Sequence, residues 1–180
     1  DNGFRRLVDS SLDWGMNLPG LRRWLDGHDP DRSKPLFLAY FGTDSPRYHG
    51  IESLRLPGFF DRRKVEPYAL TAGYYAISAT LFQGVYTMAF GPWSKAYEAR
   101  YQLALENMRV LEQTFDDRNK ILQDPRSEIF KNEFYIYDHL RFARLCAWLR
   151  HQGDPLDHVG HSILIWKLDH DDLNAALFGP

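Results

Sequence analysis

The chain has 180 residues, of which 44% are hydrophobic and 26% charged. This size and composition are typical of one globular domain and exclude a disordered, collagen-like or coiled-coil chain. Its 22 basic and 24 acidic residues leave a net charge of −2, so the chain lacks a basic field for nucleic acid and no nucleic-acid partner is expected.

The first elements are predicted to be a strand, a helix and a strand. Residues 6–9 read as a short apolar strand, and leucines recur at helical spacing from Leu18 until Gly27, a residue type that commonly follows helix ends. The apolar run at residues 35–41 then predicts a second, buried strand. Such a βαβ unit implies two parallel strands joined by a right-handed crossover.

Further elements follow a Gly/Pro-rich loop at residues 42–50. We predict strands at 52–56 and 74–79, the latter continuing over 85–89 beyond a break at Gly84, and a strand at 159–168. We predict helices from Ser94, as N-cap, to Phe115, from Pro125 to Gly153 as one helix or two, and a short final helix capped by Asp171-Asp172. The predicted fold class is α/β, with a mixed, partly parallel sheet and helices packed on its faces.

The segment from Pro67 to Ser94 carries no charged residue. Its length alone would allow a bilayer span of about 20 residues. Polar and Gly residues interrupt it throughout, and its tyrosines and β-branched residues suit buried strands better than a lipid-facing helix. We therefore place this segment in the sheet.

Polar and aromatic side chains follow the predicted parallel strands at their carboxyl ends, where open α/β sheets bind ligands. Carboxylates, hydroxyls, an amide and aromatic rings together suit a carbohydrate, because they match both the hydroxyls and the apolar face of a sugar. The alternative is that the aspartates cap a turn and the aromatic rings belong to the core. The candidate ligand-binding residues are Asp9, Asp13, Trp14, Thr43, Asp44, Tyr48, Ser78, Thr80, Gln83 and Tyr86.

Other groups of residues give less specific indications of function. Asp9 and Asp13 could act as an acid/base pair, or hold a hard cation together with Asp44, which leaves a cation-dependent hydrolase or transferase as an alternative function. His158 and His161 have a metal-site spacing but lack a third ligand. The single cysteine, Cys146, forms no internal disulfide and is predicted to be inert packing. We assign no catalytic residue, no metal and no cofactor.

Four ordered motifs resemble the C-terminal soluble region of bacterial membrane glycosyltransferases of family 39, the dolichyl-phosphate-mannose-protein mannosyltransferase-like proteins. The resemblance covers most of the chain except about residues 100–135. The motifs are Val8-Asp9-Ser10-Ser11-Leu12-Asp13-Trp14-Gly15; Leu38-Ala39-Tyr40-Phe41-Gly42-Thr43 with Pro46, Tyr48, Gly50 and Ile51; Ala76-Ile77-Ser78-Ala79-Thr80 with Gln83-Gly84-Val85-Tyr86; and Gly160-His161-Ser162-Ile163.

This chain departs from that family at three places in the proposed crevice. Relatives tend to carry Gln-Asp at Met16-Asn17, Ala-Asp at Asp44-Ser45 and Asn at Leu81. By resemblance, the parent enzyme transfers a sugar from a polyprenyl-phosphate carrier and performs catalysis in its membrane part.

The resemblance also implies where the domain works and what it contacts. The chain, which starts at Asp1 without a signal-peptide pattern, is then a fragment of a longer membrane protein, tethered on the extracytoplasmic (periplasmic) face of the inner membrane. Its expected partners are a sugar or lipid-linked sugar and the membrane-embedded part of the same chain. A pure assembly module that binds no ligand is a further alternative.

Overall fold

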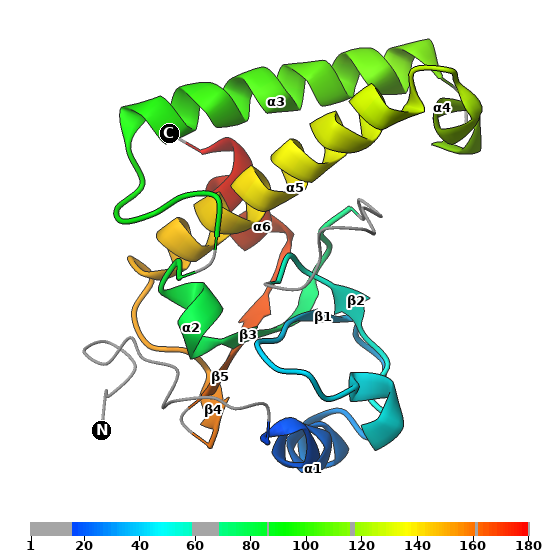
Figure 1. The fold of residues 1–180 in the computed structure, drawn as a ribbon. Coiled ribbons are helices and arrows are strands. Elements are labelled where there is room, and N and C mark those ends of the chain that lie inside the picture. Colours follow the sequence, from blue (N-terminus) through cyan, green and yellow to red (C-terminus); the bar gives the residue numbers. More distant parts are fainter. Residues whose placement is uncertain (1–15, 59–68, 86, 116–117, 161, 180) are drawn as a thin grey trace.

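The structure is a computed structural model that describes residues 16–58, 69–85, 87–115, 118–160 and 162–179. The strands are β1 (Leu36–Ala39), β2 (Leu54–Arg55), β3 (Gly73–Ser78), β4 (Asp157–Val159) and β5 (Ile163–Leu168). The helices are α1 (Leu18–His28), the 3-10 turn η3 (Pro46–His49), α2 (Ala79–Phe82), α3 (Lys95–Thr114), α4 (Arg118–Gln123), α5 (Ser127–Leu149) and α6 (His170–Phe178). Helix α1 covers one face of the sheet, α5 and α6 lie over the other, and α3 packs outside α5 (Figure 1).

The described strands form one mixed sheet in the order β2-β1-β3-β5-β4. Strand β1 runs parallel to both β2 and β3, whereas β5 runs antiparallel to β3 and β4. This confirms the predicted α/β class and the partly parallel sheet with helices on its faces. The predicted first strand at residues 6–9 lies outside the described residues, so the observed order begins with α1 and β1.

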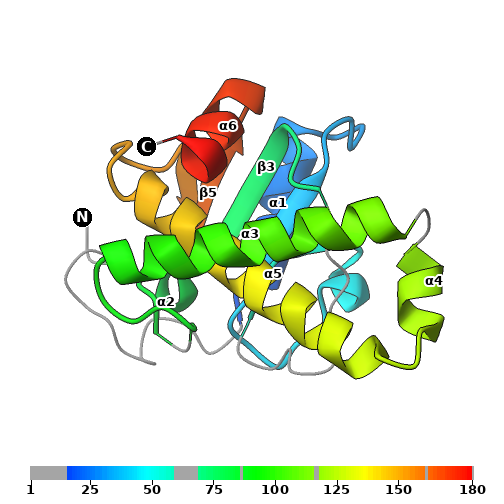
Figure 2. The same cartoon turned by 90° about the horizontal axis from the view of Figure 1, so that it is seen from above.

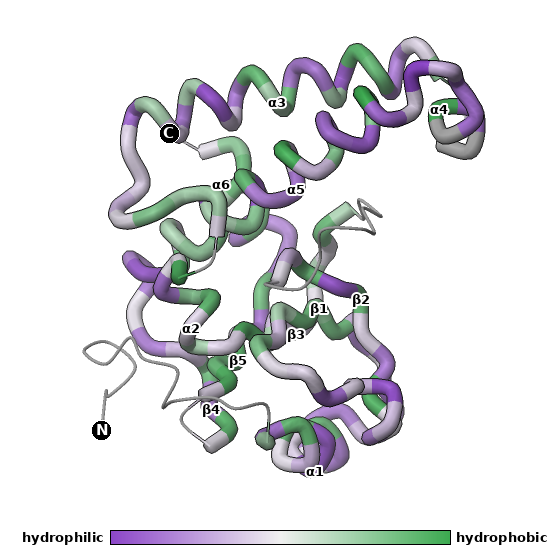
Figure 3. Tube along the Cα trace, viewed as in Figure 1, coloured by the Kyte–Doolittle hydropathy of each residue, from purple (hydrophilic) through white to green (hydrophobic). Residues whose placement is uncertain are grey.

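Alternate residues of the central strands face two separate cores. In β5, Leu164, Trp166 and Leu168 join the core beneath α5 and α6. Ile163 and Ile165 join the second core against α1. Both faces of the sheet carry apolar residues, and β1 and much of β5 are correspondingly green in Figure 3. The predicted alternation of the β5 residues is therefore confirmed.

Helix α1 forms where the leucine spacing predicted it. Leu18, Leu21 and Leu25 are buried against the sheet, and a proline lies in the first turn, where a missing backbone N–H costs no helical hydrogen bond. The helix continues through Gly27, the predicted cap, to His28. The buried Asp29 then ends it, and its carboxylate accepts hydrogen bonds from the next loop.

The two long helices α3 and α5 lie side by side, with α4 at their far ends (Figure 2). Ser94 caps α3 as predicted, because its Oγ accepts the backbone N–H of Tyr97 at 3.3 Å. Residues after Pro125 form one continuous helix of 23 residues rather than two. The short helix α4 between them was not predicted.

Two predicted strands are wrong in detail. The described residues around Gly84 form a tight turn instead of continuing β3, because Gly84 has φ of +79° and Thr87 Oγ1 donates within the turn to Gly84 O and Ala89 O. The strand predicted at 159–168 is two strands, β4 and β5. Gly160, with φ of +56°, reverses the chain between them and makes a hairpin.

The final helix is capped at Asp169, two residues before the predicted Asp171. The N-cap is Asp169, whose Oδ1 accepts the backbone N–H of Asp172 at 2.9 Å, while Asp172 Oδ2 accepts the N–H of Asp169 at 3.0 Å. This reciprocal capping box satisfies two N–H groups that the helix leaves unpaired. Asp172 therefore takes part in the cap, but from the third helical position.

The described part of the charge-free segment belongs to the sheet and its turn. Strand β3 runs through it fully buried, with all six of its residues inaccessible to solvent. Among the helices that the structure describes, none combines the length and the apolar character that a bilayer crossing requires.

Candidate ligand-binding site

A cleft of about 750 Å³ opens at the carboxyl ends of β1 and β2. It lies within the size range of about 300–1,000 Å³ that is usual for ligand pockets. One wall comes from the end of β1 and the following loop to η3, and the other from the segment that leads through β2. The lining residues are Leu38, Tyr40, residues 42–47, residues 51–53, Arg55, Leu56 and Gly58.

The lining mixes a ring, hydroxyls and charges of both signs. Tyr40 supplies the aromatic ring, and Thr43 and Ser53 supply hydroxyls. Two residues with carboxylates, Asp44 and Glu52, line the same cleft as two arginines, Arg47 and Arg55. Such a set offers both donors and acceptors to a polyhydroxylated ligand, together with one apolar face.

The loop that carries Asp44 is held by short local contacts. His49 Nε2 lies 2.6 Å from Asp44 Oδ2, and Asp44 Oδ1 accepts the N–H of Ser45 at 2.7 Å. The hydrogen bond with His49 lowers the pKa of Asp44 below its usual value, with the Ser45 N–H adding to the effect. Asp44 is therefore a carboxylate at neutral pH and accepts hydrogen bonds in the cleft.

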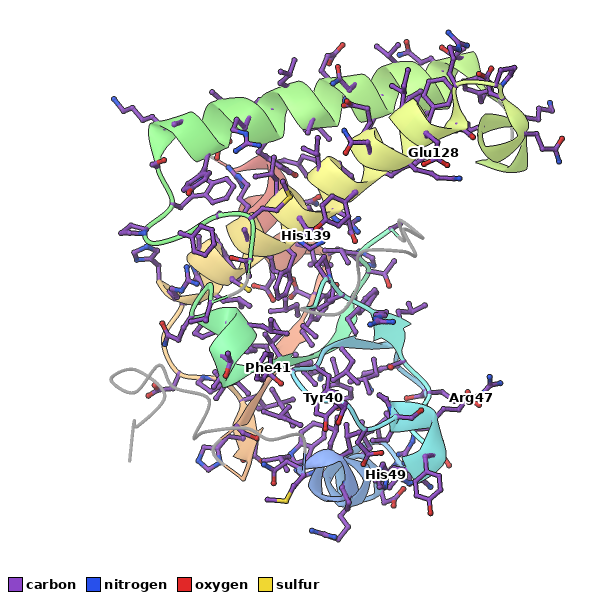
Figure 4. The ribbon with its side chains drawn as sticks, viewed as in Figure 1. Tyr40, Phe41, Arg47, His49, Glu128 and His139 are labelled. Atoms are coloured by element: carbon purple, nitrogen blue, oxygen red, sulfur yellow. The ribbon has the colours of Figure 1, made fainter. Side chains whose placement is uncertain are left out.

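A glycine closes this loop behind η3. Gly50 has φ of +66° and its N–H bonds to Arg47 O, while Arg22 Nη1 of α1 donates to Gly50 O at 2.5 Å. Only glycine adopts this backbone conformation without strain. Figure 4 shows Arg47 and His49 on η3, with Arg47 extended away from the body of the molecule.

The structure places the predicted site residues in three groups. Thr43 and Asp44 line the cleft. Tyr48 is 84% exposed and does not line it, and Gln83 lies half-buried at the end of α2. Ser78 and Thr80 are buried. Four further candidates, Asp9, Asp13, Trp14 and Tyr86, lie outside the described residues.

Ser78 serves the backbone in this structure. Its Oγ accepts the N–H of Phe41 at 2.9 Å and so joins the carboxyl ends of β1 and β3. Thr80 begins the next helix, and within the described chain its buried Oγ1 has no hydrogen-bond partner. Both side chains lie under the carboxyl edge of the sheet rather than in the cleft.

Six polar, charged or aromatic residues of the cleft are absent from the predicted candidates: Tyr40, Ser45, Arg47, Glu52, Ser53 and Arg55. Tyr40 lies near the carboxyl end of the strand predicted at residues 35–41, which is a usable signal. The last three depend on the parallel pairing of β2 with β1, in which Leu54 lies opposite Phe37. A strand of two residues carries no periodicity that would show its direction.

Of the other predicted clusters, Asp9, Asp13 and His161 lie outside the described residues. Within the described ranges, no three His, Cys, Asp or Glu side chains gather in a way that could hold a metal ion. Asp157, beside His158, accepts the indole N–H of Trp24 at 2.7 Å. Cys146 is fully buried, and this burial raises the pKa of its thiol to about 12, which makes it inert as a nucleophile.

Comparison with known protein families, with curated proteins and with solved structures finds no significant match to this chain.

Proposed function

We propose that this chain is an extracytoplasmic accessory domain of a polyprenyl-phosphate-sugar-dependent membrane glycosyltransferase and binds a sugar or glycan in the cleft at the carboxyl ends of β1 and β2. The observation that carries the proposal is the lining of that cleft, in which one aromatic ring stands among hydroxyls, carboxylates and guanidinium groups. The resemblance of the motifs to family 39 supports the choice of parent enzyme.

One of the motifs coincides with the cleft. Residues 38–43, one of the quoted motifs, run from β1 into the cleft wall, and Pro46 and Ile51 from the same motif also line it. Gly50 supplies the turn behind η3. This one motif therefore contributes to the pocket wall, whereas Ala76, Ile77 and Ile163 of two other motifs lie in the cores.

Sugar recognition follows from this chemistry. The ionised Asp44 and Glu52 accept hydrogen bonds from sugar hydroxyls, while Thr43 and Ser53 both donate and accept. A tyrosine ring covers the apolar C–H face of a pyranose. The proposed role is binding, with catalysis in the membrane part of the enzyme, as the resemblance implies.

Calorimetric titration with mannose, glucose and their oligomers tests the proposal. Tyrosine and hydroxyl variants suit this cleft, because no tryptophan lines it. We expect Tyr40→Ala to weaken saccharide binding roughly five-fold, as loss of about 1 kcal/mol of ring contact implies. Thr43→Val, nearly the same shape without the hydroxyl, should weaken binding to a similar degree.

A matched control is Phe90→Ala, which removes another aromatic ring, 68% exposed and outside the cleft. It should leave binding unchanged. Weakened binding in Tyr48→Ala with none in Tyr40→Ala would move the ligand out of the cleft. Absence of any saccharide binding by the wild-type chain would contradict the proposal.

A further inference from the structure

A second pocket, of about 590 Å³, lies at the opposite end of the same two strands. It is bounded by the end of α1, by the loop from Asp29 to Pro35 and by the starts of β1 and β2. None of its residues belongs to the predicted site. By itself it also falls within the usual size range of ligand pockets, about 300–1,000 Å³.

The two pockets share part of their walls. Glu52 and Ser53, both exposed, line the first pocket and the second. In β1, Leu36 lines the second pocket and Leu38 the first, and both side chains belong to the core on the α1 side of the sheet. The pockets are therefore neighbours on one face, and together they form a groove along β1 and β2.

The side chains that line the second pocket favour a hydroxyl-rich chain over a lipid. Seven of its thirteen lining residues carry a charge or a hydroxyl, among them Arg22, Arg32, Ser33 and Lys34. Arg22 and Arg32 both pair with Asp26, and the buried Asp29 accepts from Ser33 Oγ at 2.8 Å. These paired charges give a polar, nearly neutral wall.

Such a wall offers hydrogen-bond donors and acceptors to the hydroxyl groups along a saccharide chain. An acyl or polyprenyl chain would instead need a continuous apolar track, because leaving the charged groups dry and facing hydrocarbon is costly. Lys34 adds a donor at the far end of the groove, with its Nζ 5.8 Å from the centre of the Tyr74 ring. The position of Lys34, at the far end from Tyr40, makes it a separate probe of the second pocket.

We infer that the ligand is an oligosaccharide long enough to occupy both pockets, as a glycan acceptor would be, rather than a single sugar or the lipid of a lipid-linked donor. This inference rests on the proposed function. The reducing and non-reducing ends of this oligosaccharide would lie on either side of Glu52 and Ser53. A monosaccharide would occupy only the first pocket, beside Tyr40.

A chain-length series tests the inference. Calorimetric titration of the wild-type chain with unbranched mannose and glucose oligomers, from monosaccharide to hexasaccharide, should show affinity that rises with length. Lys34→Ala should weaken hexasaccharide binding roughly five-fold, as expected for one lost hydrogen bond of about 1 kcal/mol, and leave monosaccharide binding unchanged. Lys95→Ala, an exposed lysine at the start of α3, is the matched control.

The outcomes separate the two proposals. One outcome is equal affinity for short and long oligomers, no effect of Lys34→Ala and weaker saccharide binding in Tyr40→Ala. This outcome overturns the extended ligand but supports a sugar site in the first pocket. No binding at any length overturns both. Circular dichroism melting of each variant shows whether it folds, and Lys34→Gln, which keeps a donor, should recover part of the hexasaccharide affinity if Lys34 contacts the ligand.

Discussion

Asn17 Nδ2 donates a hydrogen bond of 2.6 Å to Ser162 Oγ, across 145 positions of the sequence. Ser162 is fully buried, and its backbone carbonyl accepts the N–H of Ala79 at 2.7 Å. The start of α1, the end of β3 and the β4–β5 hairpin therefore meet at one point. This point lies at the carboxyl end of β3, on the sheet edge where the neighbouring β1 and β2 open into the cleft.

Loss of the Asn17 side chain is expected to destabilise the domain. Asn17→Ala leaves the buried Ser162 hydroxyl without its donor, at a cost of about 1–2 kcal/mol. Thermal unfolding should show a fall in Tm of about 2–4 °C for each kcal/mol in a chain of this size. Asn17→Asp, which can accept a hydrogen bond from the Ser162 hydroxyl, should retain most of the stability; equal losses in both variants would contradict this account.

Gly160 should tolerate no larger residue while Asn17 is present. A Cβ at this position would lie 2.7 Å from Asn17 Cγ, and the backbone has φ of +56°. Gly160→Ala thus adds a steric clash to a backbone cost of about 1–2 kcal/mol.

A double-mutant cycle separates these two costs. In the Asn17→Ala background the clashing atoms are gone, so Gly160→Ala should cost only the backbone part. Denaturant unfolding of the four proteins measures the coupling. Additive effects would show that Gly160 and Asn17 do not touch as described.

Arg144 of α5 is expected to be the most sensitive charged residue outside the cleft. Its Nε lies 2.9 Å from Glu98 Oε2 of α3, its Nη2 donates to Gly179 O at 2.6 Å, and its Nη1 donates to Ala176 O. Arg144→Met removes a guanidinium that is 7% exposed and takes this donor from the two carbonyl groups, while Glu98 keeps hydrogen bonds from Trp93 and Gln102. The free energy of unfolding should fall by about 3–5 kcal/mol.

Two further variants test the same network. Arg144→Lys keeps the charge but cannot reach Glu98 and two carbonyl groups at once, so its loss should be intermediate. Arg109→Met breaks an exposed salt bridge on α3 and should lower the free energy of unfolding by less than about 1 kcal/mol. Similar losses in Arg144→Met and Arg109→Met would rule out a central role for Arg144.

The stability of the α1–β1 loop should depend on pH in the acid range. The Ser33 hydroxyl and the N–H groups of Lys34 and Ser33 lower the pKa of Asp29 below its ordinary value of 3.8, against an opposing effect of burial. The unfolded chain therefore binds this proton more tightly. The stabilisation is complete above pH 3.8 and is lost as the pH falls through the lower, folded pKa.

Ser33→Ala removes the largest cause of that shift. Wild type and Ser33→Ala should differ in stability near neutral pH and converge as the pH falls from about 6 to about 2, because a protonated Asp29 loses the benefit in both. Urea unfolding across that range measures the difference. A constant difference at every pH would show that the Ser33 hydroxyl acts without regard to the charge of Asp29.

Local patterns predicted the parts of the fold that local chemistry controls. The leucine spacing of α1, the Ser94 cap and the opposite orientations of Ile163 and Leu164 all depend on neighbours within a few residues. The turn at Gly160 was missed because Val159 and the apolar run from Ile163 onward were interpreted as one strand.

The site was only partly predictable, because long-range pairing builds it. Thr43 and Asp44 follow β1 directly and were found, whereas Glu52 and Ser53 reach the cleft only because β2 pairs with β1. Ser78 shows the opposite error, because it was predicted to bind the ligand and does not line the cleft. A polar residue at a strand end resembles a ligand group, yet here it accepts the N–H of Phe41.

The most direct test of the sugar-binding cleft is a two-dimensional amide NMR titration of the chain with a mannose or glucose oligosaccharide. The account predicts shifts concentrated at Thr43, Asp44 and Ser53, with the amides of α3 unaffected. Shifts confined to other surfaces, or no shifts at saturating saccharide, would contradict it.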